Sequence, residues 1–142
     1  MKTPRRRARE LAVQALYQSN INHTAAPEVA KNIQDLPDFE KADKELFTKL
    51  FFGTHSNAAE YMTRIRPLLD RDEKDLSPIE RAVLLMACLE LSAMPETPYP
   101  VIINEAIEVT KTFGGIDGHK FVNGILDRLA AQLRPDDPKR GA

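Results

Sequence analysis

The chain has 142 residues, of which 42% are hydrophobic and 29% charged, with ten prolines and six glycines. This composition is typical of a globular domain with a buried core, not of a disordered or fibrous chain. No apolar run approaches the ~20 residues that a transmembrane helix needs, so a role within a membrane is excluded. One cysteine and three scattered histidines predict neither a disulfide nor a metal site, and the expected location is cytoplasmic.

The net charge of −1 conceals a cationic N-terminus. Five of the twenty basic residues lie in the first nine positions, with no acidic residue among them: Lys2, Arg5, Arg6, Arg7 and Arg9. The other fifteen basic residues face twenty-one acidic ones, which gives the rest of the chain a charge of −6. The pattern favours a local contact with phosphates, although a solvated, frayed terminus would look the same.

Helical periodicity runs through the first half of the chain, and no period-2 pattern indicates a strand. We predict helices over about residues 5–18 and 28–35. A third helical stretch should extend over residues 39–69, with a bend or an end near Gly53 and a stop or kink at Pro67.

The charged run 70–75 is the expected boundary between the two halves. After it, Ser77 is predicted as the N-cap of a helix, with Glu80 at the reciprocal position of a capping box. Eight successive apolar residues, 82–89, predict that this helix is buried on nearly all sides.

Two more helices complete the prediction. The first covers about residues 101–113 and should end in a left-handed cap at Gly114-Gly115, and Asp117 is expected to cap the last. The sum is a single all-α domain, a compact bundle of about seven helices in two helical subdomains. Its N-terminal half covers about residues 1–69, its C-terminal half about 77–134, and a flexible tail 135–142.

Tyr17 is an aromatic candidate for a binding role. The apolar face of the first helix centres on its alanines, and Arg6, Glu10, Gln14 and Tyr17 are expected on the opposite side, with Arg7 beside them. Arginine can bind phosphate, glutamine can read a base edge and a tyrosine ring can stack on an unpaired base. Alternatively, Tyr17 packs beneath the following segment.

Phe121 raises the same question on the last helix. It lies about a quarter-turn from the centre of the apolar stripe, with Lys120 before it and Gly124 one turn later. Lys120 near a helix N-terminus favours an anion, and the ring could stack on a base. Alternatively, Phe121 only widens the core face.

Catalytic chemistry has weak support. Cys88 lies within the apolar helix with no basic neighbour, so a buried, inert thiol is expected. Glu105 and Glu108 are one turn apart but lack a histidine partner, and Gly114-Gly115 fits neither common phosphate-loop pattern. We therefore expect no enzyme, no catalytic or metal-binding residue and no cofactor.

Six segments carry distinctive motifs: RRRARE (5–10), AVQALY (12–17), IERAVL (79–84), INEAIE (103–108), KTFG (111–114) and HKFVNGILD (119–127). Together they resemble the NusB family of bacterial transcription antitermination factors over nearly the whole chain. The resemblance implies an all-α fold of two helical subdomains and a non-catalytic adaptor for RNA. The implied partners are the single-stranded boxA element of nascent ribosomal RNA, the small-subunit ribosomal protein NusE, other Nus factors and RNA polymerase.

The resemblance also assigns roles to individual residues. The implied RNA-binding residues are Arg5, Arg6, Arg7, Gln14, Tyr17, Lys120 and Phe121, and Asp117 is tied to complex formation. Two positions depart from the family pattern: Gly118 replaces a usual serine, and Leu68 stands where some relatives have tyrosine.

Two other functions fit the same sequence features. NusB-like domains also precede ribosomal RNA cytosine methyltransferases, so the chain could be the substrate-recruiting module of such an enzyme. It lacks, however, a methyl-donor-binding βαβ unit and a second cysteine. It could also be a protein-interaction bundle whose basic N-terminus is incidental.

Overall fold

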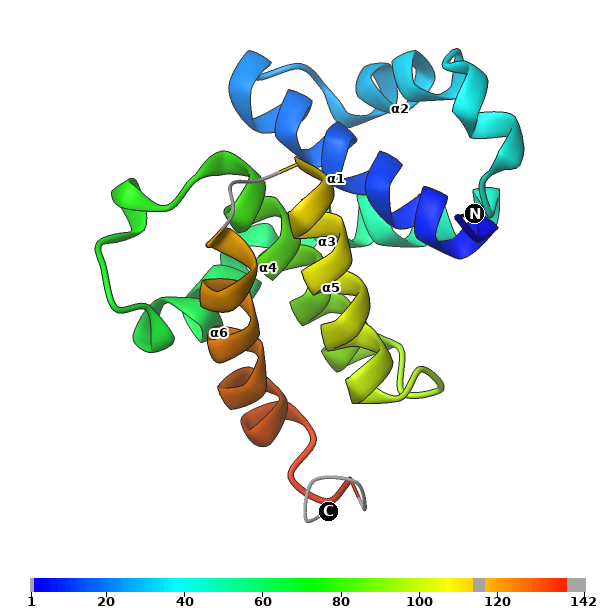
Figure 1. Cartoon of the computed structure of the whole chain (residues 1–142). Coiled ribbons are helices and arrows are strands. Elements are labelled where there is room, and N and C mark those ends of the chain that lie inside the picture. Colours follow the sequence, from blue (N-terminus) through cyan, green and yellow to red (C-terminus); the bar gives the residue numbers. More distant parts are fainter. Residues whose placement is uncertain (1, 114–116, 138–142) are drawn as a thin grey trace. The chain divides into compact units, whose positions relative to one another are not determined.

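The computed structural model describes residues 2–113 and 117–137 (Figure 1). Over these ranges all regular structure is helical, with six α-helices and three short 3-10 helices, which confirms the all-α prediction. In chain order the elements are α1 Pro4–Asn22, α2 Ala26–Gln34, η1 Pro37–Lys41, α3 Lys44–Ile65, η2 Arg66–Leu68, η3 Glu73–Asp75, α4 Pro78–Ala93, α5 Tyr99–Phe113 and α6 Gly118–Leu133. No helix within the described ranges is long and apolar enough to cross a membrane.

The chain divides into two compact units, Met1–Ala58 and Ala59–Ala142. The division falls inside α3, whereas the sequence places the boundary between the halves at the charged run 70–75. The last turns of α3 belong to the second unit because Tyr61, Met62 and Ile65 are buried, and Tyr61 lies near Cys88 of α4.

In the first unit, α1 packs against α2 and η1 (Figure 1). Thr3 is the N-cap of α1, since its hydroxyl accepts a 3.0 Å hydrogen bond from the Arg6 amide, and Pro4 occupies the first turn. The helix ends at His23, whose left-handed backbone (φ 53°) lets its amide bond to the Ser19 carbonyl. α1 therefore extends further at its C-terminus than the predicted helix.

Aromatic rings fill the core of the first unit. Phe39 packs edge-on against Phe47 with ring centroids 5.4 Å apart, and Phe47 stacks on Phe51 at 5.9 Å. Phe39 belongs to η1 and not to the long helix, because Asp43 caps α3 through a 3.0 Å bond from the Leu46 amide to its carboxylate. The prediction that one helical stretch begins at Phe39 is therefore wrong.

The bend expected near Gly53 lies four residues later. Asn57 has non-helical backbone angles (φ −116°, ψ 15°), and its side-chain amide donates a 2.8 Å hydrogen bond to the Gly53 carbonyl. The side chain thus binds the carbonyl that the helical backbone would otherwise use, which accounts for a kink at asparagine. The predicted stop at Pro67 is confirmed, because α3 ends at Ile65 and η2 follows.

In the second unit, α4, α5 and α6 pack against one another, and η2 packs against α6. The predicted cap of α4 is confirmed by a 3.1 Å hydrogen bond from the Glu80 amide to the Ser77 hydroxyl. Residues 82–91 are all buried, as the apolar run 82–89 predicts. The glycine cap predicted after α5 lies outside the described residues.

The C-terminal end of α4 is fixed by an arginine that the sequence pattern did not single out. The Arg134 guanidinium, just after α6, donates hydrogen bonds of 2.6 to 3.1 Å to four carbonyl oxygens: those of Glu90, Leu91, Met94 and Thr97. Two of these carbonyls, those of Glu90 and Met94, also accept backbone hydrogen bonds, from the Met94 and Thr97 amides. Arg134 therefore joins the end of α6 to the turn that follows α4. Of the tail predicted to be flexible, residues 138–142 lie outside the described ranges.

Candidate nucleic-acid interface

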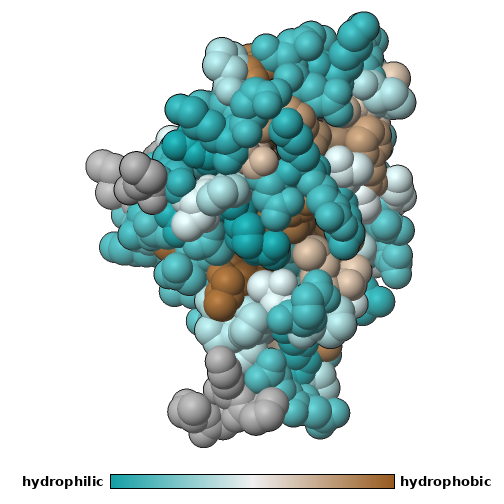
Figure 2. Space-filling view, turned by 90° about the vertical axis from the view of Figure 1, so that its right-hand side faces the viewer, coloured by the Kyte–Doolittle hydropathy of each residue, from teal (hydrophilic) through white to brown (hydrophobic). Residues whose placement is uncertain are grey.

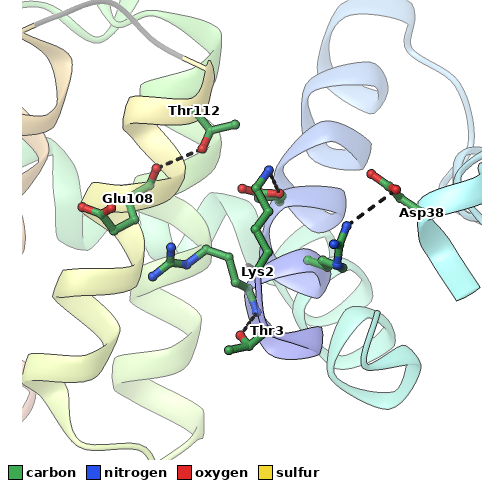
Figure 3. A network of polar contacts seen from close by, with 8 residues as sticks. Lys2, Thr3, Asp38, Glu108 and Thr112 are labelled. Atoms are coloured by element: carbon green, nitrogen blue, oxygen red, sulfur yellow. Dashed lines mark hydrogen bonds and ion pairs between the residues drawn. The ribbon is translucent and has the colours of Figure 1, made fainter. Parts of the chain in front are cut away.

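The arginines at the start of α1 lie partly at the surface, and two of them pair with acidic residues of the same unit. Arg5 is 3.6 Å from the Asp43 carboxylate. Arg7 is 3.6 Å from the Asp38 carboxylate, and Figure 3 shows this contact to Asp38. The side chains are at most partly buried, and these distances are long for a direct hydrogen bond, so the pairs are loose. Arg6 is half-buried, and its backbone amide is bound by Thr3.

Two charged residues of α1 are buried. Arg9 is only 2% exposed, and Glu10 accepts a 2.9 Å hydrogen bond from Lys2 and is also buried (Figure 3). The prediction that Glu10 projects from the solvent side is therefore wrong. Periodicity could not reveal this, because the carboxylate is charged like a surface group yet has a lysine partner eight residues away.

Tyr17 is 38% exposed, and Ile21, one turn later, is also exposed. Tyr17 is therefore not fully covered by the following segment. Gln14 is half-buried, three residues before Tyr17 on the same helix. Hydrophilic residues predominate on the face drawn in Figure 2, where hydrophobic residues form only small separate areas. The exposed ring of Tyr17 could stack on an unpaired base.

The second candidate group lies at the start of α6, in the second unit. Phe121 is half-buried, and the Arg71 guanidinium lies over its ring, 4.0 Å from the centroid. Lys120 has a 75% exposed side chain, and its ammonium is 3.9 Å from the Asp117 carboxylate. Phe121 is therefore not a fully buried core residue.

Asp117 occupies the N-cap position of α6, but its side chain makes no capping hydrogen bond. Its backbone lies in the helical region (φ −98°, ψ −5°), and only its carbonyl accepts a bond, from the Lys120 amide at 3.2 Å. The prediction of a side-chain cap is therefore wrong, because a side-chain cap needs an extended backbone at that position. The Asp117 carboxylate is exposed.

A segment that we call the connector, residues 66–77, lies between α3 and α4 and approaches α6. Glu73 binds two arginines, Arg66 at 2.8 Å and Arg81 of α4 at 2.7 Å. Both bonds lower the pKa of the Glu73 carboxyl below its ordinary value of 4.5, and the bond to Arg81 has the larger effect. Arg128 of α6 donates a 3.0 Å bond to the Leu68 carbonyl, so the connector is tied to both helices.

Leu68 and Cys88 are buried. Position 68, one of the two departures from the family pattern, thus carries a side chain that is covered by its neighbours. Burial raises the pKa of the Cys88 thiol to about 11, which keeps it protonated at neutral pH. Among the described residues no three His, Cys, Asp or Glu side chains are grouped as metal ligands would be.

Arg71, which contacts Phe121 at the start of α6, was not predicted from the sequence. It is separated from Phe121 by fifty positions and lies in a run of charged residues, so no local pattern distinguishes it.

Comparison with known proteins identifies the family. The NusB family model matches residues 6–131. The chain belongs to the NusB family. Transcription antitermination protein NusB of Neisseria meningitidis serogroup A / serotype 4A is 83% identical over 140 residues, which cover 99% of each chain.

Solved structures of the family have the same fold. A crystal form of T. maritima NusB is 34% identical, with a TM-score of 0.81 and coverage of 93% of this chain and 94% of that one. A crystal structure of antitermination factors NusB and NusE in complex with dsRNA is 21% identical, with a TM-score of 0.78 and coverage of 93% and 99%. At that identity the second likeness concerns the fold alone.

Proposed function

We propose that this protein is an RNA-binding transcription antitermination factor that binds the boxA element of nascent ribosomal RNA together with NusE. Through this complex it joins other Nus factors on RNA polymerase, as a non-catalytic adaptor that needs no cofactor. A factor acting on nascent bacterial transcripts works in the cytoplasm. The relative from N. meningitidis bears the name of an antitermination protein, and a protein of the same fold was crystallised with NusE and RNA.

The structural observation that carries the proposal is the exposure of Tyr17 on the helix whose first turn bears three arginines. Aromatic rings and arginine guanidinium groups at the surface are common means of binding single-stranded RNA. We assign RNA contacts to two groups of side chains, one in each unit: Arg5, Arg6, Arg7, Gln14 and Tyr17, and Lys120 and Phe121. The exposed Asp117 carboxylate is assigned to complex formation.

The test is binding of a labelled single-stranded boxA oligonucleotide, compared with a scrambled oligonucleotide of the same composition, with and without NusE. We expect preference for boxA, strengthened by NusE. Affinity should fall with salt, with a log–log slope of about −0.7 for each phosphate neutralised. Equal, weak binding to both RNAs would instead support a protein-interaction bundle.

Two substitutions test the stacking contacts. Tyr17→Ala and Phe121→Ala should each weaken boxA binding by roughly five- to 150-fold, the equivalent of about 1–3 kcal/mol per stacked base. Ile21→Ala is the matched control, since Ile21 is exposed and apolar on the same helix as Tyr17. Far-UV circular dichroism should show unchanged helix content in all three variants. Unchanged affinity in both aromatic variants would remove the stacking contacts from the proposal.

A further inference from the structure

Arg71 and Phe121 form one cation–π pair at the start of α6. The guanidinium carbon lies 4.0 Å from the ring centroid, within the range of a cation–π contact. An arginine in a cation–π contact keeps its N–H donors, which can bind a phosphate by two parallel hydrogen bonds.

The connector fixes Arg71 in this place. On one side Glu73 binds Arg81 of α4 at 2.7 Å, and on the other Arg128 of α6 binds the Leu68 carbonyl at 3.0 Å. Arg71 lies between these two anchors in the sequence. Its position over Phe121 is therefore supported by bonds that do not involve the ring.

The guanidinium is only partly engaged. Its Nε donates a 2.8 Å hydrogen bond to Asp70, and its side chain is 39% exposed. Among the described residues its terminal nitrogens have no hydrogen-bond acceptor, although Glu80 and Asp75 lie near enough to act on its charge. The edge of the guanidinium that suits a phosphate is thus available to a ligand.

We propose that Arg71 is an RNA-contacting residue, which binds the phosphate next to the base that Phe121 contacts. The inference rests on the proposed function and adds to it a residue outside the family motifs quoted above. Arg71 and Phe121 act as one unit, because the ring orients the guanidinium and the guanidinium covers one face of the ring. Lys120, adjacent in sequence and exposed, adds positive charge at the same place.

The test compares Arg71→Ala with Arg64→Ala in boxA binding by the full-length chain. Arg64 is a matched control because it is a partly exposed arginine of the same unit, also paired with a nearby carboxylate, that of Glu60 at 3.7 Å. Arg71→Ala should weaken binding roughly three- to tenfold at physiological salt and reduce the log–log salt slope by about 0.7. Arg64→Ala should change neither quantity.

Two further variants separate a phosphate contact from a structural effect. Arg71→Lys keeps the positive charge but lacks the planar guanidinium group. It should therefore have the salt slope of the unsubstituted protein, with an affinity between those of Arg71→Ala and the unsubstituted protein. Arg71→Ala combined with Phe121→Ala should weaken binding less than the product of the two single effects, because the residues act together. Thermal unfolding of Arg71→Ala should match that of the unsubstituted protein.

The outcomes distinguish this inference from the proposed function. If the unsubstituted protein prefers boxA but Arg71→Ala binds it equally well or more tightly, with the same salt slope, the role of Arg71 is refuted and the proposed function remains. If the unsubstituted protein does not distinguish boxA from scrambled RNA, the proposed function fails and Arg71 loses its ligand with it.

Discussion

The guanidinium of Arg134 donates a 2.6 Å hydrogen bond to the carbonyl oxygen of Thr97, and this is the shortest of its four bonds to backbone carbonyls. One side chain thereby satisfies the carbonyls at the end of α4 and in the following turn. Replacing Arg134 by alanine would remove this donor from the Leu91 and Thr97 carbonyls, whereas the Glu90 and Met94 carbonyls would keep the bonds they accept from the Met94 and Thr97 amides. We expect a loss of about 2–3 kcal/mol in the free energy of unfolding, measured by urea denaturation.

Arg134→Lys and Arg64→Ala serve as comparisons for that measurement. Lysine has a single ammonium and cannot reach four carbonyls in the geometry of a guanidinium, so it should restore less than half of the loss. The surface variant Arg64→Ala should change stability by less than about 0.5 kcal/mol. If Arg134→Ala had the same free energy of unfolding as the unsubstituted protein, the four bonds would stabilise the fold no more than bonds from these carbonyls to water.

Gly118 and Glu80 are expected to be energetically coupled. A Cβ atom built on Gly118 would lie 2.9 Å from the Glu80 Oε2, closer than real contacts allow, but this oxygen is the end of a flexible side chain. In Gly118→Ala the displacement of Glu80 should offset the gain in helix propensity, leaving stability within about 0.5 kcal/mol of the starting value. In a Glu80→Ala background the same substitution should stabilise by about 0.5–1 kcal/mol. Identical effects in both backgrounds, in thermal or urea unfolding, would rule out the contact.

Glu73 should make the stability of the second unit depend on acid pH. Its pKa is lowered by Arg81 and Arg66, so the carboxylate favours the folded state above the ordinary value of 4.5. This contribution is lost as the pH falls through the lowered pKa. The free energy of unfolding of the unsubstituted protein should therefore exceed that of Glu73→Gln by a constant amount above about pH 5, at most about 1 kcal/mol for each ion pair. This difference should shrink towards pH 3. Urea unfolding across this range measures it, and an advantage that grows on acidification would contradict the assignment.

Cys88 should resist thiol reagents while the protein is folded. With the pKa raised from 9.0 to about 11, the thiolate fraction near pH 8 is about 100-fold below that of an ordinary thiol, and burial restricts access further. Reaction with a colorimetric disulfide reagent should be slow in buffer and rapid in denaturant. Because the pKa is raised, the protonated thiol favours folding below pH 9, and this contribution is lost as the pH rises through about 11. Rapid labelling in buffer would show that α4 opens readily.

Much of the helical framework could be predicted, because the deciding signals are local. Ser77 caps α4 as its spacing from Glu80 indicates, and the apolar run behind it is buried. The errors arise where a side chain replaces a backbone interaction. Asn57 produces the kink that was expected at Gly53. Asp43 caps α3, so this helix begins after Phe39 and does not include it.

The candidate site could be predicted only in part. Tyr17 was distinguished by its place opposite the alanine face of α1, and it is exposed. The partners of charged residues were not predictable, since they lie far apart in sequence: Arg71 meets Phe121, and Arg134 reaches the turn after α4. Pairings of this kind depend on helix packing, which periodicity does not specify.

The loose pairs of Arg5 with Asp43 and of Arg7 with Asp38 bear on selectivity. In the unliganded protein each carboxylate is a built-in competitor for any incoming polyanion. Heparin, duplex DNA or random RNA must displace this carboxylate before it can bind the same guanidinium. Negative charge alone therefore adds little to binding affinity. Discrimination among nucleic acids then depends mainly on the contacts between the bases and the aromatic rings.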